Sequence, residues 1–134
     1  LDGWQPTHLC WFASPPRSGG VAGLFSDRLH QQLSSVMVDA FERQVADLSA
    51  PPLRGVLWPS SELIDRPGPG NDELVAVLAA GEASCRRLAG SRPELSVHVP
   101  RWPRLATDQT ASLLPVEYAD TASVMLAALR ALPN

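Results

Sequence analysis

The chain begins with a strand–loop–helix pattern that favours a layered α/β fold. A continuous apolar run at residues 8–13 is followed by a proline- and glycine-rich loop at residues 14–20 and by a long amphipathic segment that ends near Leu48. A continuous rather than alternating apolar run is typical of strands that are buried on both faces of a parallel sheet. The pattern therefore predicts a buried strand, a turn, and a helix that packs back on the strand.

The amphipathic segment has a clear beginning and a clear end. Ser26 is a suitable N-cap residue, and the carboxylate of Asp27 suits the positive end of a helix dipole. Apolar residues then recur at helical spacing as far as Leu48, and the prolines at positions 51 and 52 cannot continue the helix. Residues 53–58 read as the next strand, so a right-handed βαβ unit is expected.

The rest of the chain extends this pattern. We expect a helix from Asp72, its cap, to about residue 89, with Gly90 as its end. Apolar and polar residues alternate over residues 95–99, which predicts a half-exposed strand at an edge of the sheet. We expect this strand to end at residues 100–103. A short helical turn at 107–114 and a last helix at 117–132, with Leu129 among its inward residues, complete the prediction. The expected fold class is α/β, three-layered, with a small, mostly parallel sheet and flanking helices, as one domain over residues 1–134 or a fragment of a larger α/β domain.

Composition narrows the classes of function. Of the 134 residues, 45% are hydrophobic and 19% charged, which indicates a globular chain. The net charge is −3, and the basic residues are scattered arginines with no lysine, so no basic stripe for nucleic acid is present. No apolar run is long enough for a membrane span, and no signal peptide is visible. We therefore expect a cytoplasmic protein without a transmembrane segment or a nucleic-acid partner.

Two segments of the sequence are candidate binding sites. In the first loop, Arg17, Ser18, Gly19 and Gly20 form an anion- or phosphate-binding candidate, because glycine N–H groups and a following helix dipole both favour an anion. The loop matches neither G-x-x-x-x-G-K-[ST] nor G-x-G-x-x-G, and Pro15 and Pro16 remove two donors. Ser60, Ser61 and Glu62 follow the second predicted strand, at the end where open α/β sheets place their sites, although a polar loop is the simpler interpretation.

Complete catalytic or metal motifs are absent from the sequence. There is no G-x-S-x-G elbow and no H-E-x-x-H, and the three histidines lie far apart. Cys10 and Cys85 match no metal-ligand spacing, so we interpret both as reduced, apolar residues. We accordingly predict no metal site and no cofactor.

Several weak motifs occur in the order found in one enzyme family. They are Ala13-Ser14-Pro15-Pro16, Arg28 with the helical Phe41-Glu42-Arg43-Gln44-Val45-Ala46-Asp47-Leu48, the strand Leu53-Arg54-Gly55-Val56-Leu57-Trp58, and Pro103-Arg104-Leu105-Ala106 followed by Tyr118 and an Ala/Leu helix. Together they resemble the C-terminal part of bacterial patatin-like phospholipases. The resemblance covers most of the chain.

That resemblance implies a function. Patatin-like enzymes use a Ser-Asp dyad, and Asp2-Gly3 would be the remnant of the D-G-[GA] motif, with Trp4 in place of the small residue. Asp2 is then the catalytic candidate, the serine nucleophile is missing, and the chain would be the C-terminal portion of a lipid acyl hydrolase. The alternative is a non-enzymatic α/β binding or interaction module that uses the loop at residues 17–20. The partners expected are a small anionic or lipid ligand, and a second copy of the chain or a partner segment.

Overall fold

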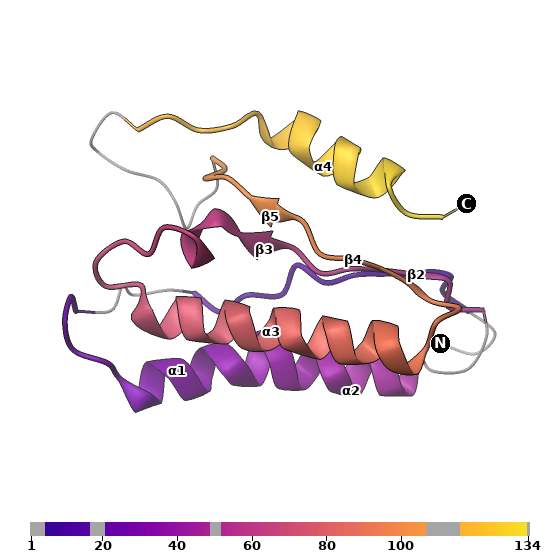
Figure 1. The fold of residues 1–134 in the computed structure, drawn as a ribbon, viewed down its shortest axis with the longest axis horizontal. Coiled ribbons are helices and arrows are strands. Elements are labelled where there is room, and N and C mark those ends of the chain that lie inside the picture. Colours follow the sequence, from indigo (N-terminus) through magenta and orange to yellow (C-terminus); the bar gives the residue numbers. More distant parts are fainter. Residues whose placement is uncertain (1–4, 17–20, 49–51, 107–115, 134) are drawn as a thin grey trace.

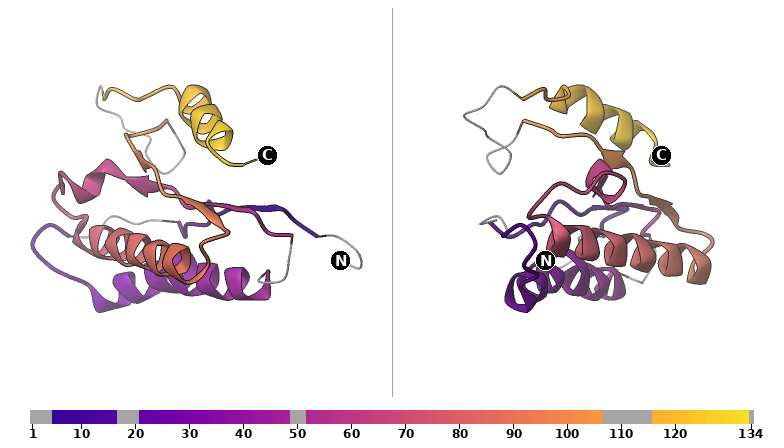
Figure 2. Two further views of the ribbon diagram at one scale, coloured as in Figure 1. Left: turned by 45° about the vertical axis from the view of Figure 1, so that its right-hand side comes forward. Right: turned by 60° about the vertical axis from the view of Figure 1, so that its left-hand side comes forward.

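Helices lie on both faces of a small parallel β-sheet (Figure 1). The computed structural model of the chain describes residues 5–16, 21–48, 52–106 and 116–133. Within them, α1, α2 and α3 cover one face of the sheet and α4 lies on the other (Figure 2). The predicted fold class, an α/β fold with a small parallel sheet and flanking helices, is confirmed.

The central sheet has three parallel strands in the order β1-β2-β4, which are His8–Cys10, Gly55–Leu57 and Ser96–His98. β2 is fully buried between its neighbours, whereas β1 and β4 are edge strands and are partly exposed. Two shorter strands follow β2 and β4 in the chain and form a second parallel pair, β3 (Ser60–Ser61) with β5 (Arg101–Trp102). The prediction of an edge strand within residues 95–99 is confirmed.

The long helical segment consists of α1 (Asp27–Ser34), a π turn η1 (Ser35–Asp39) and α2 (Ala40–Asp47). Ser26 caps α1 as predicted, because its hydroxyl oxygen accepts a hydrogen bond from the backbone N–H of Leu29. In the π turn, the N–H of Ala40 donates to the carbonyl of Ser35, five residues earlier. The sequence pattern did not predict this turn.

The core lies between the sheet and these helices. α3 (Asp72–Ser91) packs beside the long helical segment, and its buried residues include Val77, Leu78 and Cys85. The Trp58 ring, which is 1% exposed, lies against Gly81 and donates from Nε1 to the Met37 carbonyl over 3.2 Å. No helix among the described residues is long and apolar enough to cross a membrane.

The opposite face is covered more loosely. α4 (Thr121–Arg130) begins at Asp120, whose carboxylate accepts from the Ser123 N–H, and it buries only Ala128. The His8 ring donates from Nε2 to the Pro133 carbonyl over 2.7 Å and so ties the segment after α4 to β1. Leu129 is 42% exposed, so the prediction that it points inward is wrong.

Other differences from the prediction have local causes. α3 is preceded by Asn71 at the cap position, with Asp72 as its first residue, and it continues through Gly90 to Ser91. Residues 100–103 do not simply break the strand, because Arg101–Trp102 pairs with β3. The last helix starts at Thr121 rather than residue 117. The turn predicted at 107–114 lies outside the described residues.

Candidate functional site

A cleft of about 640 Å³ opens at the carboxyl ends of the parallel strands. Its walls come from the segments that follow β1, β2 and β5, together with Met37, Asn71 and Leu74 from the helical layer. Open α/β sheets bind their ligands in this position, and the volume lies within the range of small-molecule sites, roughly 300–1,000 Å³. The cleft is therefore the candidate ligand site of this chain.

Aromatic side chains form much of the wall. Trp11 and Phe12 follow β1, and Phe12 stacks on Trp102 with ring centroids 6.0 Å apart and planes at 24°. The Trp11 ring packs on Phe41 of α2. Its buried Nε1–H has no hydrogen-bond partner in the described part of the chain. A ligand or a water molecule that accepts a hydrogen bond from this donor would satisfy it.

The polar part of the cleft lies between β2 and α3. Pro59 ends β2, and Ser61 caps a short 3-10 turn, η2 (Glu62–Ile64), by accepting from the backbone N–H of Leu63 over 3.2 Å. This hydrogen bond uses the Ser61 oxygen and leaves its hydroxyl proton for a ligand. Ser60 is 4% exposed and donates to Oε1 of Glu82 over 2.7 Å, so its hydroxyl proton is already used.

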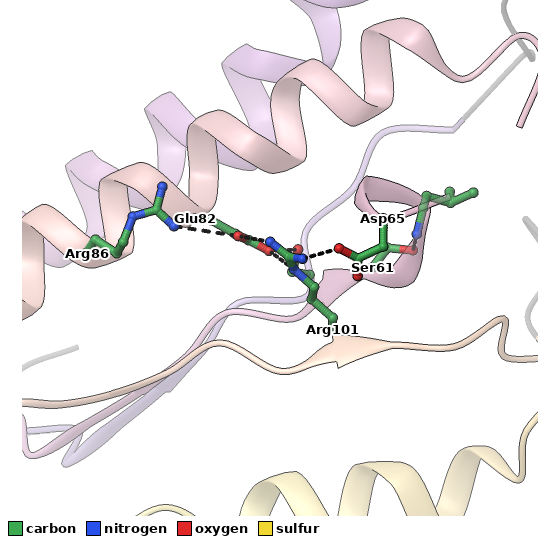
Figure 3. A network of polar contacts seen from close by, with 7 residues as sticks. Ser61, Asp65, Glu82, Arg86 and Arg101 are labelled. Atoms are coloured by element: carbon green, nitrogen blue, oxygen red, sulfur yellow. Dashed lines mark hydrogen bonds and ion pairs between the residues drawn. The ribbon is translucent and has the colours of Figure 1, made fainter. Parts of the chain in front are cut away.

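The Arg101 guanidinium lies between Glu82 of α3 and Asp65 and contacts both (Figure 3). Arg101 on β5 donates from Nε and Nη2 to the two carboxylate oxygens of Glu82, each over 2.8 Å, and from Nη1 to Asp65 after η2. Arg86, one turn further along α3, lies 3.6 Å from the same Glu82 carboxylate. The segment after β2, the segment of β5 and helix α3 are thereby held in one arrangement.

These contacts fix the protonation state of Glu82. Hydrogen bonding to Arg101 is the largest cause that lowers its pKa to about 2, against the opposing effect of burial, and the same contact raises the pKa of Arg101. A carboxylate with a pKa of about 2 is a poor general base near neutral pH. Glu82 therefore positions the walls of the cleft rather than accepting a proton from a ligand.

Two further arginines lie at the cleft. Arg66 follows η2, is exposed, and has no acidic partner in the described ranges. Arg104 follows β5, and its guanidinium lies over the Tyr118 ring, 5.4 Å from the centroid. Among the described lining residues, these two arginines stand against one acidic side chain, Glu62, a balance that suits a ligand with a planar ring and an anionic group.

The structure does not test the catalytic and ligand-binding residues predicted from the sequence. Asp2, Arg17, Ser18, Gly19 and Gly20 all lie outside the described residues. Ser60, Ser61 and Glu62, considered from their place after the second strand, do line the cleft. Sequence analysis did not predict the aromatic side chains of the cleft wall. The sequence feature that could have indicated them is the pair Trp11 and Phe12 near the end of the first apolar run. No group of three potential metal ligands comes together in the described part of the chain.

Comparisons with known proteins bear on the fold. No protein-family model matches the sequence, and no curated protein matches it by sequence. Among solved structures, a short-chain dehydrogenase from Salmonella enterica serovar Typhi has a TM-score of 0.72 at 17% identity, over 90% of this chain and 54% of that one. A short-chain dehydrogenase/reductase from Vibrio parahaemolyticus has a TM-score of 0.63 at 14% identity, over 95% and 60%.

A third structure, 4-hydroxyisoleucine dehydrogenase in complex with NADH and succinate, has a TM-score of 0.60 at 16% identity, over 80% of this chain and 55% of that one. The chain thus spans little more than half the length of the structures it matches. Sequence identities this low do not show that the chain shares an activity with these enzymes. They show the fold alone.

The comparisons overturn the expected resemblance to patatin-like phospholipases. The interpretation of the chain as part of a lipid acyl hydrolase is wrong, because the fold matches short-chain dehydrogenases. The alternative of a non-enzymatic module that binds through residues 17–20 stays a prediction, because these residues lie outside the described ranges. The chain has a Rossmann-like α/β fold of the kind seen in short-chain dehydrogenases.

Proposed function

We propose that this chain is part of an NAD(P)-binding domain and that its cleft takes the cofactor. The observation that carries the proposal is the position of the cleft, which opens at the carboxyl ends of three parallel strands in a Rossmann-like sheet. Dinucleotides bind in this place in doubly wound folds. One structural neighbour was solved in complex with NADH, which favours the same ligand class here.

The lining residues fit one end of such a cofactor. The stacked Phe12 and Trp102 rings offer an apolar surface to a planar nicotinamide ring, while the unpaired Trp11 Nε1–H and the free Ser61 proton offer donors to its carboxamide or ribose oxygens. Arg66 supplies positive charge for a phosphate. When bound, NAD(P) supplies hydride transfer. The residues of this chain bind and orient it.

Titration with NADH and NADPH tests the proposal. Three tryptophans of the described ranges line the cleft, so a bound reduced nicotinamide should quench their fluorescence saturably. Phe12→Ala should weaken binding by about two- to tenfold, since an aromatic contact contributes roughly 0.5–1.5 kcal/mol. The matched control is Phe25→Ala, because Phe25 is similarly exposed, 53% against 48% for Phe12, and contacts an aromatic ring, that of His30, outside the cleft.

The control variant should bind both nucleotides as the unaltered chain does. Absence of saturable quenching with either nucleotide would refute the proposal. An equal loss of affinity in the two phenylalanine variants would place the ligand somewhere other than the cleft.

A further inference from the structure

The parallel pairing of β3 with β5 brings two arginines to the same end of that pair. Ser61 lies opposite Trp102 in the register, and the chain leaves both strands in the same direction. Arg66 follows β3 through the turn η2, whereas Arg104 follows β5 after Pro103, and both arginines line the cleft. Each of the two segments that leave the strands therefore brings one guanidinium to the cleft.

The segment before α4 holds Arg104 in place. The Arg104 carbonyl accepts from the Ala119 N–H over 3.0 Å, and Leu105 forms a parallel bridge with Ala119. The guanidinium of Arg104 lies over the Tyr118 ring, 5.4 Å from the centroid. A cation–π contact acts through the charge of the guanidinium, so it does not consume the N–H donors with which an arginine binds an anion. The contact with Tyr118 thus orients Arg104 at the cleft wall.

Arg104 also follows directly on the aromatic part of the cleft. Trp102 lies just before it in the chain and stacks on Phe12 with ring centroids 6.0 Å apart. Under the proposed function these two rings contact the nicotinamide, and Arg66, on the other segment, supplies charge for a phosphate of the cofactor. A group held by Arg104 would then lie beside the nicotinamide ring rather than along the rest of the cofactor.

We propose that Arg104 binds the carboxylate of a small monocarboxylic acid, which is the second ligand of the cleft. This inference rests on the proposed function, because it places the acid beside a bound nicotinamide. A carboxylate matches a guanidinium, since both groups are planar and two parallel N–H···O hydrogen bonds join them. Glu62, the acidic side chain on the described lining, repels a second negative charge, which favours an acid with one carboxylate over a diacid.

A matched pair of ligands tests the inference on the full chain saturated with NADH. L-lactate and L-lactamide have nearly the same shape, but only lactate is charged, and neither is reduced by NADH. In titrations followed by the NMR signal of the ligand methyl group, lactate should bind about tenfold or more tightly than lactamide, since hydrogen bonds between charged groups are the stronger ones.

The outcomes separate this inference from the proposed function. Equal affinity for lactate and lactamide, or no binding of lactate to a chain that binds NADH, would overturn the inference while sustaining the proposed function. If the chain did not bind NADH, both would be refuted.

Variants show whether Arg104 is the residue responsible. Arg104→Gln should remove most of the preference for lactate over lactamide, a loss of about tenfold. Arg130→Gln is the matched control, because Arg130 is an exposed arginine in the last turn of α4 that does not line the cleft, and it should keep the preference. Tyr118→Leu should reduce the preference by about threefold, because the guanidinium loses the ring that orients it.

The ratio of the two affinities is the decisive measurement, because a general loss of structure would weaken the binding of both ligands alike. An unchanged ratio in Arg104→Gln would overturn the inference. If the same variant also bound NADH more weakly, Arg104 would hold a phosphate of the cofactor instead of a carboxylate.

Discussion

Replacing Gly81 by alanine would place a methyl group inside the Trp58 ring. A Cβ on Gly81 would lie 2.1 Å from Cζ2 and 2.3 Å from Cη2 of Trp58, far below the contact distance of about 3.5–4 Å between carbon atoms. The ring has little freedom to move aside, because it is 1% exposed and its Nε1–H is bonded to the Met37 carbonyl. Either the ring or helix α3 must shift.

The expected change in the free energy of unfolding of Gly81→Ala is the sum of opposing contributions. Overpacking of a buried site costs about 1–3 kcal/mol, and loss of the hydrogen bond from Trp58 to Met37 would add about 1 kcal/mol. Alanine is a better helix former than glycine by up to about 1 kcal/mol, which offsets part of the cost. We expect Gly81→Ala to lower the free energy of unfolding by about 1–3 kcal/mol, a large share of the roughly 5–15 kcal/mol typical of a native domain.

Urea unfolding followed by circular dichroism measures this change. Gly90→Ala in the same helix is the matched control, since a Cβ there meets no atom within 4 Å. It should raise the free energy of unfolding by about 0.5–1 kcal/mol through helix propensity alone. The reasoning would be refuted if Gly81→Ala had an unfolding midpoint equal to or above that of Gly90→Ala. Because Trp58 also lines the cleft, NADH affinity should fall in Gly81→Ala and not in Gly90→Ala.

The Glu82 carboxylate, with a folded pKa of about 2 and an ordinary value of 4.5, stabilises the folded state fully above pH 4.5 and loses this contribution as the pH falls towards 2. Glu82→Gln should therefore show a smaller loss of stability between pH 5 and pH 2.5 in urea titrations, by about 2 kcal/mol, and parallel pH profiles would contradict the assignment. Gly55→Ala would bring a Cβ to 2.6 Å from the His8 ring, so it should lower the free energy of unfolding by about 1–2 kcal/mol. Because the same ring is hydrogen-bonded to the Pro133 carbonyl after α4, amide exchange in α4 should also become faster, and unchanged exchange there would show that this hydrogen bond does not hold α4 in place. Ser26→Ala removes the cap of α1 and should cost about 1 kcal/mol in thermal unfolding, whereas Ser26→Gly should cost only a few tenths.

Hydrophobic spacing was sufficient to predict the order of the main elements. The apolar run at residues 8–13 and the strand predicted at 53–58 contain β1 and β2. β2 is buried, as a continuous apolar run indicates, whereas β1 is a partly exposed edge strand, so the prediction that it is buried was wrong. The helix beginning at Ser26 follows from a local cap and a stripe of apolar residues. The π turn in that helix was not predicted from the spacing; the Met37 carbonyl within it accepts a hydrogen bond from Trp58, a residue distant in the sequence.

Predictions failed where tertiary contacts decide the structure. Arg101–Trp102 lies between prolines and reads as a break, yet these residues form β5 because β3 offers a partner strand. The assignment of α4 residues as inward assumed a fully covered face, and the exposed Leu129 shows looser packing there. The family resemblance failed for a different reason, because it depended on short strings of residues rather than on the arrangement of the strands and helices.

The candidate site depends on those same distant contacts. Glu82 lies within a helix and Arg101 in a two-residue strand, and neither position carries a recognisable motif. The pairing of β3 with β5 places Ser60 opposite Arg101, and the Glu82 carboxylate then accepts from both side chains. The two walls of the cleft are joined through this one carboxylate. Glu82→Gln should consequently weaken NADH binding at neutral pH although Glu82 does not line the cleft, and an unchanged affinity would mean that strand pairing alone holds the walls.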